Sequence, residues 1–300
     1  MYITPKRQGQ SEQVPNVLSV DCDSREFEHE TGQHRVSVGR RTVRSFYIEP
    51  QFVRRAKALV GMQINQAVCI GCVACIPYCP MYAISMVLGN KAKIDLEKCT
   101  ECYACLRASV CPTDAIVETP LTWPRSLRAV FGSVQTEHKE TRVPGRGTEE
   151  MKTNDVTGRF RDGEVGFSVD IGRPGVGTTF ADVETIAMEV ARVGVEFEPM
   201  NPVTYLMIDK NTGRLQEEIM KEKVHSCVME FKTSVERLPE VVQALNRAAG
   251  KVNTVFSVGC CCKVRANGEI PAKNYLDRNH ISYRPNGKTN IGLGRTALAT

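Results

Sequence analysis

Eight of the thirteen cysteines follow one spacing pattern, CxxCxxCxxxCP, which occurs twice between residues 69 and 112, the second copy being two residues longer. Two residues between consecutive cysteines let three thiolates wrap one face of an iron–sulfur cubane, because the connecting backbone can turn its amides toward the sulfurs. The fourth cysteine of each copy cannot reach the same cubane. The pattern therefore predicts two [4Fe–4S] clusters. The eight candidate ligands are Cys69, Cys72, Cys75, Cys79, Cys99, Cys102, Cys105 and Cys111.

Residues 64 to 118, which carry this pattern, resemble the bacterial two-cluster ferredoxins. The resemblance implies that the fourth cysteine of each copy, followed by Pro80 or Pro112, begins a helix and binds the cluster of the other copy. It also implies electron relay, because thiolates saturate every iron. Zinc binding is the alternative, since paired CxxC sequences also form zinc sites. The implied sets are Cys69, Cys72, Cys75 and Cys111 for cluster I, and Cys99, Cys102, Cys105 and Cys79 for cluster II.

The flanks of the two cysteine runs also repeat. Residues 81–84 correspond to residues 113–116, and Gly89-Asn90 separates two short apolar segments as a hairpin turn does. The pattern predicts an internal duplication of about 30 residues. One departure is that five residues instead of three lie between Cys105 and Cys111. We expect this longer loop to change the exposure and hydrogen bonding of a ligand, so that the two clusters differ in reduction potential.

The chain of 300 residues is long enough for about two domains. Beyond residue 164 the pattern predicts two β–α–β units, with strands at 165–171, 193–197, 227–235 and 254–264, helices at 178–192 and 238–249, and a further strand at Val203–Ile208. This α+β arrangement resembles the ferredoxin-like plait of ACT-type small-molecule-binding domains. The expected division is an N-terminal extension, partly β (1–63), the two-cluster ferredoxin domain (64–118), a connector (119–164), the plait (165–265) and a loop-like tail (266–300).

Several features outside the cysteine runs admit two interpretations. Cys227 and Cys260–Cys262 are either small buried residues or a redox or metal pair; on a strand, Cys260 and Cys262 face one side and Cys261 the other. The glycine turn at 172–177 is either a tight turn or a phosphate site, although it matches no nucleotide-binding motif. We expect Trp123 and Phe131 to anchor the connector.

The segments 143–158, 172–177 and 286–294 resemble 6-hydroxynicotinate reductase. That resemblance implies ferredoxin-dependent reduction of a ring, an oxidoreductase acting on CH–CH groups in anaerobic metabolism, with flavin beside the iron–sulfur centres. The implied partners are ferredoxin or a catalytic reductase subunit and a small carboxylate, for which Arg142, Arg146 and Arg159 are candidate contacts. A non-catalytic electron-transfer subunit of a larger complex and a redox or metabolite sensor are the alternatives.

Charge and hydropathy restrict the remaining classes of function and the expected location of the protein. The net charge of +5 is spread along the chain without a polybasic run, which disfavours nucleic-acid binding. No stretch reaches the roughly 18 apolar residues of a membrane helix. Because eight cysteines serve as thiolate ligands rather than disulfides, we expect a reducing compartment, the cytoplasm.

Overall fold

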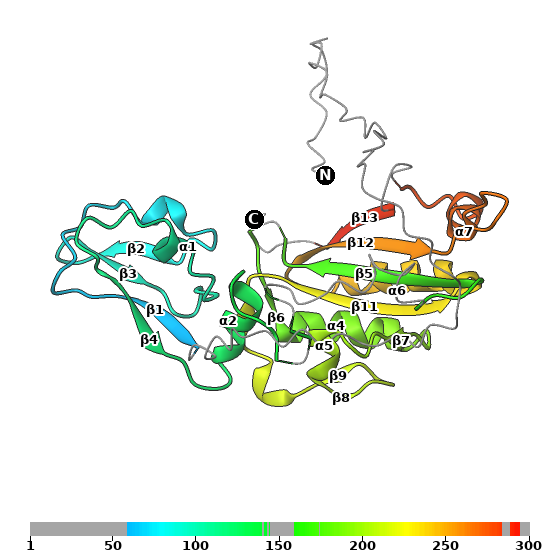
Figure 1. The fold of residues 1–300 in the computed structure, drawn as a ribbon, viewed down its shortest axis with the longest axis horizontal. Coiled ribbons are helices and arrows are strands. Elements are labelled where there is room, and N and C mark those ends of the chain that lie inside the picture. Colours follow the sequence, from blue (N-terminus) through cyan, green and yellow to red (C-terminus); the bar gives the residue numbers. More distant parts are fainter. Residues whose placement is uncertain are drawn as a thin grey trace, which may run out of the picture. The chain divides into compact units, whose positions relative to one another are not determined.

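The computed structural model describes residues 59–139, 141–142, 144, 159–173, 175–283 and the backbone of 289–294 (Figure 1). Every described residue belongs to one compact unit, within Arg54–Thr300. The expected N-terminal extension therefore lies outside the described residues, except for its last five positions.

The cysteine-bearing part is built from two antiparallel strand pairs. Strand β1 (Val60–Ile64) pairs with β4 (Ile116–Pro120), and β2 (Ile84–Val87) pairs with β3 (Lys91–Ile94). Gly89 and Asn90 both have positive φ and lie in the three-residue loop between the paired Val87 and Lys91, so the predicted hairpin is confirmed.

The predicted duplication is visible in the backbone hydrogen bonds. Asn65 N–H donates to the Ala115 carbonyl at 2.7 Å, and Asp95, thirty positions later, donates to the Ala83 carbonyl at 2.7 Å. Each of these residues then accepts from the first cysteine of its copy, at 3.1 and 3.0 Å. Both copies therefore enter their cysteine loops through the same turn.

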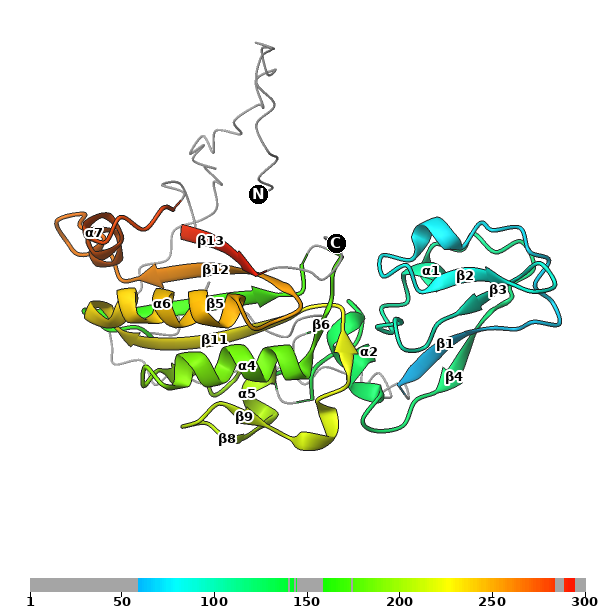
Figure 2. The same cartoon turned by 180° about the vertical axis from the view of Figure 1, so that it is seen from behind.

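A five-stranded antiparallel sheet forms the C-terminal part, in the order β13-β12-β5-β11-β7 (Figure 1). Helices α4 and α6 follow β5 and β11 in the chain and pack against each other on one face of the sheet, as the view from behind shows (Figure 2). The two β–α–β units predicted from the sequence are present. The bounds are β5 Glu164–Ile171, α4 Phe180–Ala191, β7 Glu196–Phe197, β11 Cys227–Ser234, α6 Leu238–Ala249, β12 Val255–Cys262 and β13 Thr289–Gly294.

Two expectations for this part need correction. The strand expected at Val203–Ile208 is a helical turn, α5 (Pro202–Tyr205), followed by β8 (Met207–Asp209), which pairs with β9 (Arg214–Leu215). The Asn201 side chain caps α5 by accepting from the amide two residues later at 2.9 Å, and an Asn-Pro pair favours such a helix start. Residues 266–300, expected to be loop-like, include helix α7 (Pro271–Arg278) as well as β13.

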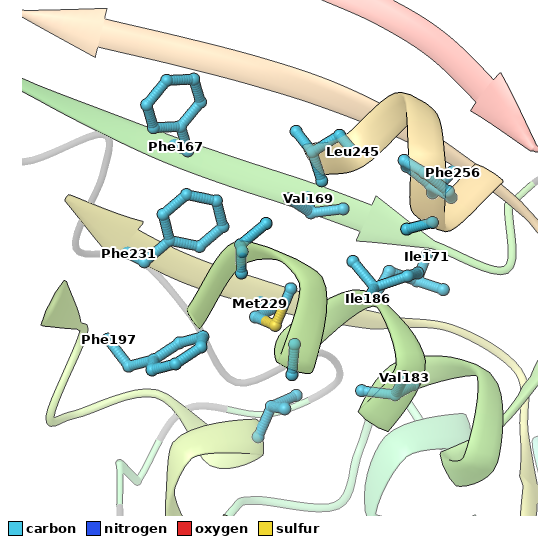
Figure 3. Close-up of a cluster of buried hydrophobic side chains, with 14 of the residues drawn as sticks. Phe167, Val169, Ile171, Val183, Ile186, Phe197, Met229, Phe231, Leu245 and Phe256 are labelled. Atoms are coloured by element: carbon cyan, nitrogen blue, oxygen red, sulfur yellow. The ribbon is translucent and has the colours of Figure 1, made fainter. Parts of the chain in front are cut away.

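The core of the C-terminal part lies between the sheet and its helices (Figure 3). Phe167 and Phe231 stack at 5.3 Å, and Phe197 meets Phe231 edge-on at 6.0 Å. The predicted apolar face of α4 is fully buried, including Val183 and Ile186. Short strands β6 (Thr178–Thr179) and β10 (Lys223–Val224) pair at one end of this part.

Helix α2 (Ser126–Gly132) lies in the described part of the connector, where the sequence predicted no helix. Its Phe131 is buried and packs edge-on against Phe180 of α4, as expected of an anchor. Trp123 is half exposed, and its indole N–H donates to Glu218 at 2.8 Å.

Candidate metal centres

The eight candidate ligands line two hollows, four in each. Each hollow is partly open to solvent. Three cysteines of each hollow come from one copy and the fourth from the other. The first hollow is lined by Cys69, Cys72, Cys75 and Cys111 and the second by Cys79, Cys99, Cys102 and Cys105.

The thiols surround these hollows instead of converging on one point. Among the described residues, no three His, Cys, Asp or Glu side chains lie close enough together to hold a single metal ion. The remaining walls are apolar: Ile64 and Ile116 line the first hollow, and Met62, Ile84 and Ile94 line the second. Each hollow, with its apolar walls, therefore suits an inorganic group of several metal ions better than a single ion.

Left-handed backbone conformations recur at matching positions of the two copies. They precede and follow the second cysteine and occur three residues after the fourth. Such conformations cost about 1–3 kcal/mol each for residues other than glycine and gather at functional sites, and alternating right- and left-handed residues point successive amides into one concavity. The matched pairs are Gly71 and Glu101, Val73 and Tyr103, and Tyr82 and Asp114.

Backbone amides donate to the sulfurs in a duplicated way. Ala83 N–H donates to Cys79 Sγ at 3.2 Å, and Ala115 N–H donates to Cys111 Sγ at 3.2 Å. Hydrogen bonds to cluster sulfurs stabilise negative charge there and influence the reduction potential. The fourth cysteine of each copy thus accepts an amide hydrogen bond from the residue four positions later.

Burial keeps several of these thiols protonated in the absence of a metal. It raises the pKa of Cys99 to about 12, an effect that the nearby Glu101 carboxylate increases. Burial also raises the pKa of Cys105 to about 11. A coordinating metal deprotonates a thiol outright, so these side chains suit metal ligation better than nucleophilic chemistry.

Helix α2 and the residues before it cover the second cysteine loop. Arg125 contacts the fully buried Glu101 through Nη2 at 2.6 Å. Arg128 Nη1 donates to the carbonyls of Leu96 and Cys99, both at 2.9 Å. A Cβ atom at Gly132 would overlap the carbonyl oxygen of Thr100, so only glycine permits this close approach. Sequence reasoning missed this cover, for which the Arg-X-X-Arg spacing is the available signal.

The five-residue spacing before Cys111 is accommodated by helix α1 (Ala104–Arg107) and a turn. Ser109 adopts a positive φ, and its amide donates to the Leu106 carbonyl at 3.1 Å. The extra residues therefore form a local bulge, as expected, while Cys111 still reaches the first hollow.

The other candidate residues lie elsewhere. Cys227 is fully buried, and Cys260 and Cys262 pack against the same core. The glycine turn is closed by Gly177 N–H donating to the Gly172 carbonyl at 2.9 Å. The amide end of the following helix α4 is occupied by its own capping box, whose Asp182 carboxylate disfavours an anion.

Of the three arginines considered as carboxylate contacts, Arg159 lines a cavity of about 170 Å³ in the C-terminal part. Arg142 is exposed, and Arg146 lies outside the described residues. Arg159 pairs with Glu198, while its buried Nε has no hydrogen-bond partner in the described part of the chain. Phe160, Phe197 and Glu230 form further walls of this cavity.

Comparison with known proteins identifies the cysteine-bearing part. The 4Fe-4S dicluster domain family matches residues 68–115. A ferredoxin of Pyrobaculum islandicum is 31% identical over 90 residues, which are 30% of this chain and 81% of the relative. A ferredoxin-like protein in the nif region of Azotobacter vinelandii is 39% identical over 70 residues, 21% of this chain and 75% of the relative. No solved structure matches the chain.

The fold and the two cysteine-lined hollows thus define an iron–sulfur protein that binds [4Fe–4S] clusters and transfers electrons. The chain belongs to the ferredoxin family. The matched relatives correspond to less than a third of it. No helix in the described ranges has the length and apolar character to cross a membrane.

Proposed function

We propose that the chain relays electrons between two clusters with exchanged ligands. Cys111 completes the first site and Cys79 the second. The single observation that carries this assignment is the division of the eight thiols into two hollows, each lined by three cysteines of one copy and one of the other. The proposed ligands are Cys69, Cys72, Cys75 and Cys111 for cluster I, and Cys99, Cys102, Cys105 and Cys79 for cluster II.

When bound, each cluster supplies one-electron transfer between two oxidation levels. The chain orients the sulfurs, donates amides to them and excludes water. Met81 lines the second hollow and touches the glycine turn, since a Cβ atom at Gly177 would lie 2.7 Å from its Cε. This contact supports electron flow between cluster II and the C-terminal part.

Single-cysteine variants test the exchange of ligands. Cys111→Ser is expected to perturb the electron paramagnetic resonance signal of the same cluster as Cys72→Ser, and Cys79→Ser that of the same cluster as Cys102→Ser. The experiment combines anaerobic purification, iron and sulfide quantitation and spectroscopy of the reduced protein. If Cys111→Ser instead altered the cluster that Cys102→Ser alters, the exchanged assignment would be wrong.

For the C-terminal part we propose an α+β plait related to ACT-type domains, in a reductase component resembling 6-hydroxynicotinate reductase. The strand order β12-β5-β11-β7 with α4 and α6 on one face is the order of a split β–α–β plait. Electrons from ferredoxin or a catalytic partner would then pass to a ring substrate. Flavin quantitation on the same sample separates a flavin-containing reductase from a relay that serves another chain.

The cavity at Arg159 is the proposed site for a small ring carboxylate. The unpartnered Nε calls for an acceptor such as a carboxylate oxygen, and the buried Glu230 can accept from a ring N–H. Phe160 and Phe197 supply apolar walls. Calorimetric titration with 6-hydroxynicotinate tests this site: Arg159→Met should weaken binding at least tenfold, the amount expected for one charge-assisted pair. Equal affinity for both proteins would remove Arg159 from the site.

A further inference from the structure

The first cysteine loop is exposed and carries no charged side chain of its own, although the Lys91 ammonium of the adjoining hairpin donates to the Cys69 carbonyl. Residues 58 to 90 contain no Asp, Glu, Lys, Arg or His, whereas the corresponding part of the second copy carries charges of both signs. Ile70 is 63% exposed, with Val68 and Val73 also exposed beside it. Cys72, between these side chains, is the exposed thiol among the eight proposed ligands. The group proposed to transfer electrons therefore reaches the surface within an apolar rim.

The second copy shows how the same loop face looks when protein covers it. Thr100, at the position of Ile70, is 1% exposed, and Glu101, at the position of Gly71, is fully buried. The cover is helix α2 of the same chain, which contacts this loop through Arg128 and Gly132. The two loops share one backbone, so the uncovered first loop presents a comparable surface to another molecule.

The β2–β3 hairpin extends this apolar rim. A Cβ atom at Gly71 would lie 3.5 Å from Met86 Cε and would overlap the carbonyl oxygen of Asn90, so the hairpin packs directly against the loop. Met86 and Leu88 are exposed on that hairpin. Contiguous exposed apolar surface marks an interaction site, and the centres of protein interfaces are depleted of charge.

We infer that this rim, formed by Val68, Ile70, Val73 and Met86 around Cys72, is the docking surface for a one-electron protein partner that presents an equally apolar, uncharged face. The inference rests on the proposed relay and names the partner's chemistry and the point of entry. A charge-steered encounter would weaken steeply with ionic strength, whereas an uncharged apolar contact would not. Electrons would enter at cluster I and reach cluster II inside the molecule.

A second copy of this chain is a suitable probe, because it presents the same apolar rim around Cys72. Electron self-exchange between oxidised and reduced copies can be measured by nuclear magnetic resonance of the paramagnetically shifted cysteine protons in half-reduced samples. The rate should change less than about twofold between 0.05 and 0.5 M salt. Ile70→Glu should lower it by roughly tenfold at low salt, through like-charge repulsion, and high salt should restore part of the loss.

Ile208→Glu is the matched control, since Ile208 on β8 is also 63% exposed but lies outside the cysteine-bearing part. It should leave the rate unchanged. Val68→Glu serves as a second variant if Ile70→Glu lowers the iron content. An unaltered rate in Ile70→Glu with full iron content, or a steep salt dependence of the unmodified protein, would overturn the docking surface. Absent clusters would instead refute the relay itself, and normal reduction of the variants by dithionite separates the two cases.

Discussion

At the scale of single residues, Arg128 connects the second cysteine loop with the C-terminal part. Arg128 is 3% exposed, and its guanidinium donates to backbone carbonyls of the loop and forms an ion pair with Glu222 at 2.5 Å. A buried arginine fork satisfies several acceptors at once, which a lysine cannot reproduce. Removing it takes the cation from Glu222 and the donor from the Cys99 carbonyl, whereas the Leu96 carbonyl still accepts from Arg125.

Arg128→Met should therefore destabilise the protein. Breaking a buried ion pair costs about 3–5 kcal/mol, which corresponds to roughly 6–20 °C in the apparent Tm of a domain of this size. The measurement is anaerobic thermal unfolding followed by cluster absorbance and circular dichroism. Arg192→Met is the control, because Arg192 is 62% exposed and its partner Glu189 keeps two other cations. Equal Tm values for the two variants would contradict the structural role of Arg128.

Glu189 on α4 is a buried carboxylate among three cations. It accepts from Lys251 Nζ at 2.6 Å, Arg192 Nη1 at 2.7 Å and Arg247 Nε at 3.1 Å. The hydrogen bond from Lys251, followed by that from Arg247, lowers the pKa of Glu189 below its ordinary value. Because the folded-state pKa is depressed, this stabilisation is complete above the unfolded-state pKa of about 4.3 and is lost only as pH falls through the lower folded-state value.

Glu189→Gln should therefore lower the apparent Tm equally at pH 7.5 and pH 5.5. The expected loss is about 1–3 kcal/mol, the usual contribution of charge-assisted hydrogen bonds. Parallel melts of both proteins at the two pH values provide the measurement. A smaller difference at pH 5.5 would mean that the pKa of Glu189 is raised in the folded state, contrary to this geometry.

At the scale of elements, the two cysteine loops share a backbone but differ in cover. The first has its second cysteine exposed, whereas α2 seals the second. Reduction adds negative charge to a cluster, and water stabilises that charge better than an apolar interior does. The corresponding amide donors to Cys79 and Cys111 are equal in length, while Ala92 N–H donates in addition to Cys69 Sγ of the first site at 3.5 Å. The greater exposure and the additional donor both favour reduction of the first site.

Cluster I should accordingly have the higher reduction potential, by on the order of tens of millivolts. A redox titration followed by electron paramagnetic resonance checks this, with Cys72→Ser and Cys102→Ser assigning each signal to a cluster. Two equal potentials, or a higher potential for the cluster that Cys102→Ser perturbs, would contradict the argument from exposure.

The cysteine loops and the two β–α–β units were predictable because their signals are local. Cysteine spacing, the Gly-Asn turn and the apolar face of α4 each depend on neighbours within a few residues. Helix α2 was not predictable in this way, since its apolar residues pack into the large core whereas its basic residues contact the second cysteine loop. The strand expected at Val203–Ile208 failed because the Asn-Pro helix start outweighed a short apolar run.

At the scale of the whole molecule, α2 belongs to two structures at once. Leu127 and Phe131 are part of the large core formed by the sheet, α4 and α6. Arg125 and Arg128 lie on the same short helix or directly before it and hold the second cysteine loop. The boundary expected at residue 118, between a ferredoxin domain and a connector, therefore lies just before α2. Helix α2 contacts both the second cysteine loop and the core of the C-terminal part. A substitution that destabilises the large core should therefore also destabilise cluster II.

Phe131→Ala tests this coupling. Removing a buried phenylalanine costs about 3–5 kcal/mol, and here the cavity opens beneath the helix that covers cluster II. We expect faster loss of cluster II than of cluster I when an iron chelator is added, resolved by their separate paramagnetic signals, together with a lower apparent Tm of the sheet. Ile208→Ala, an exposed control, should change neither. Equal rates of loss for both clusters would mean that the two parts unfold independently and that α2 is a connector after all.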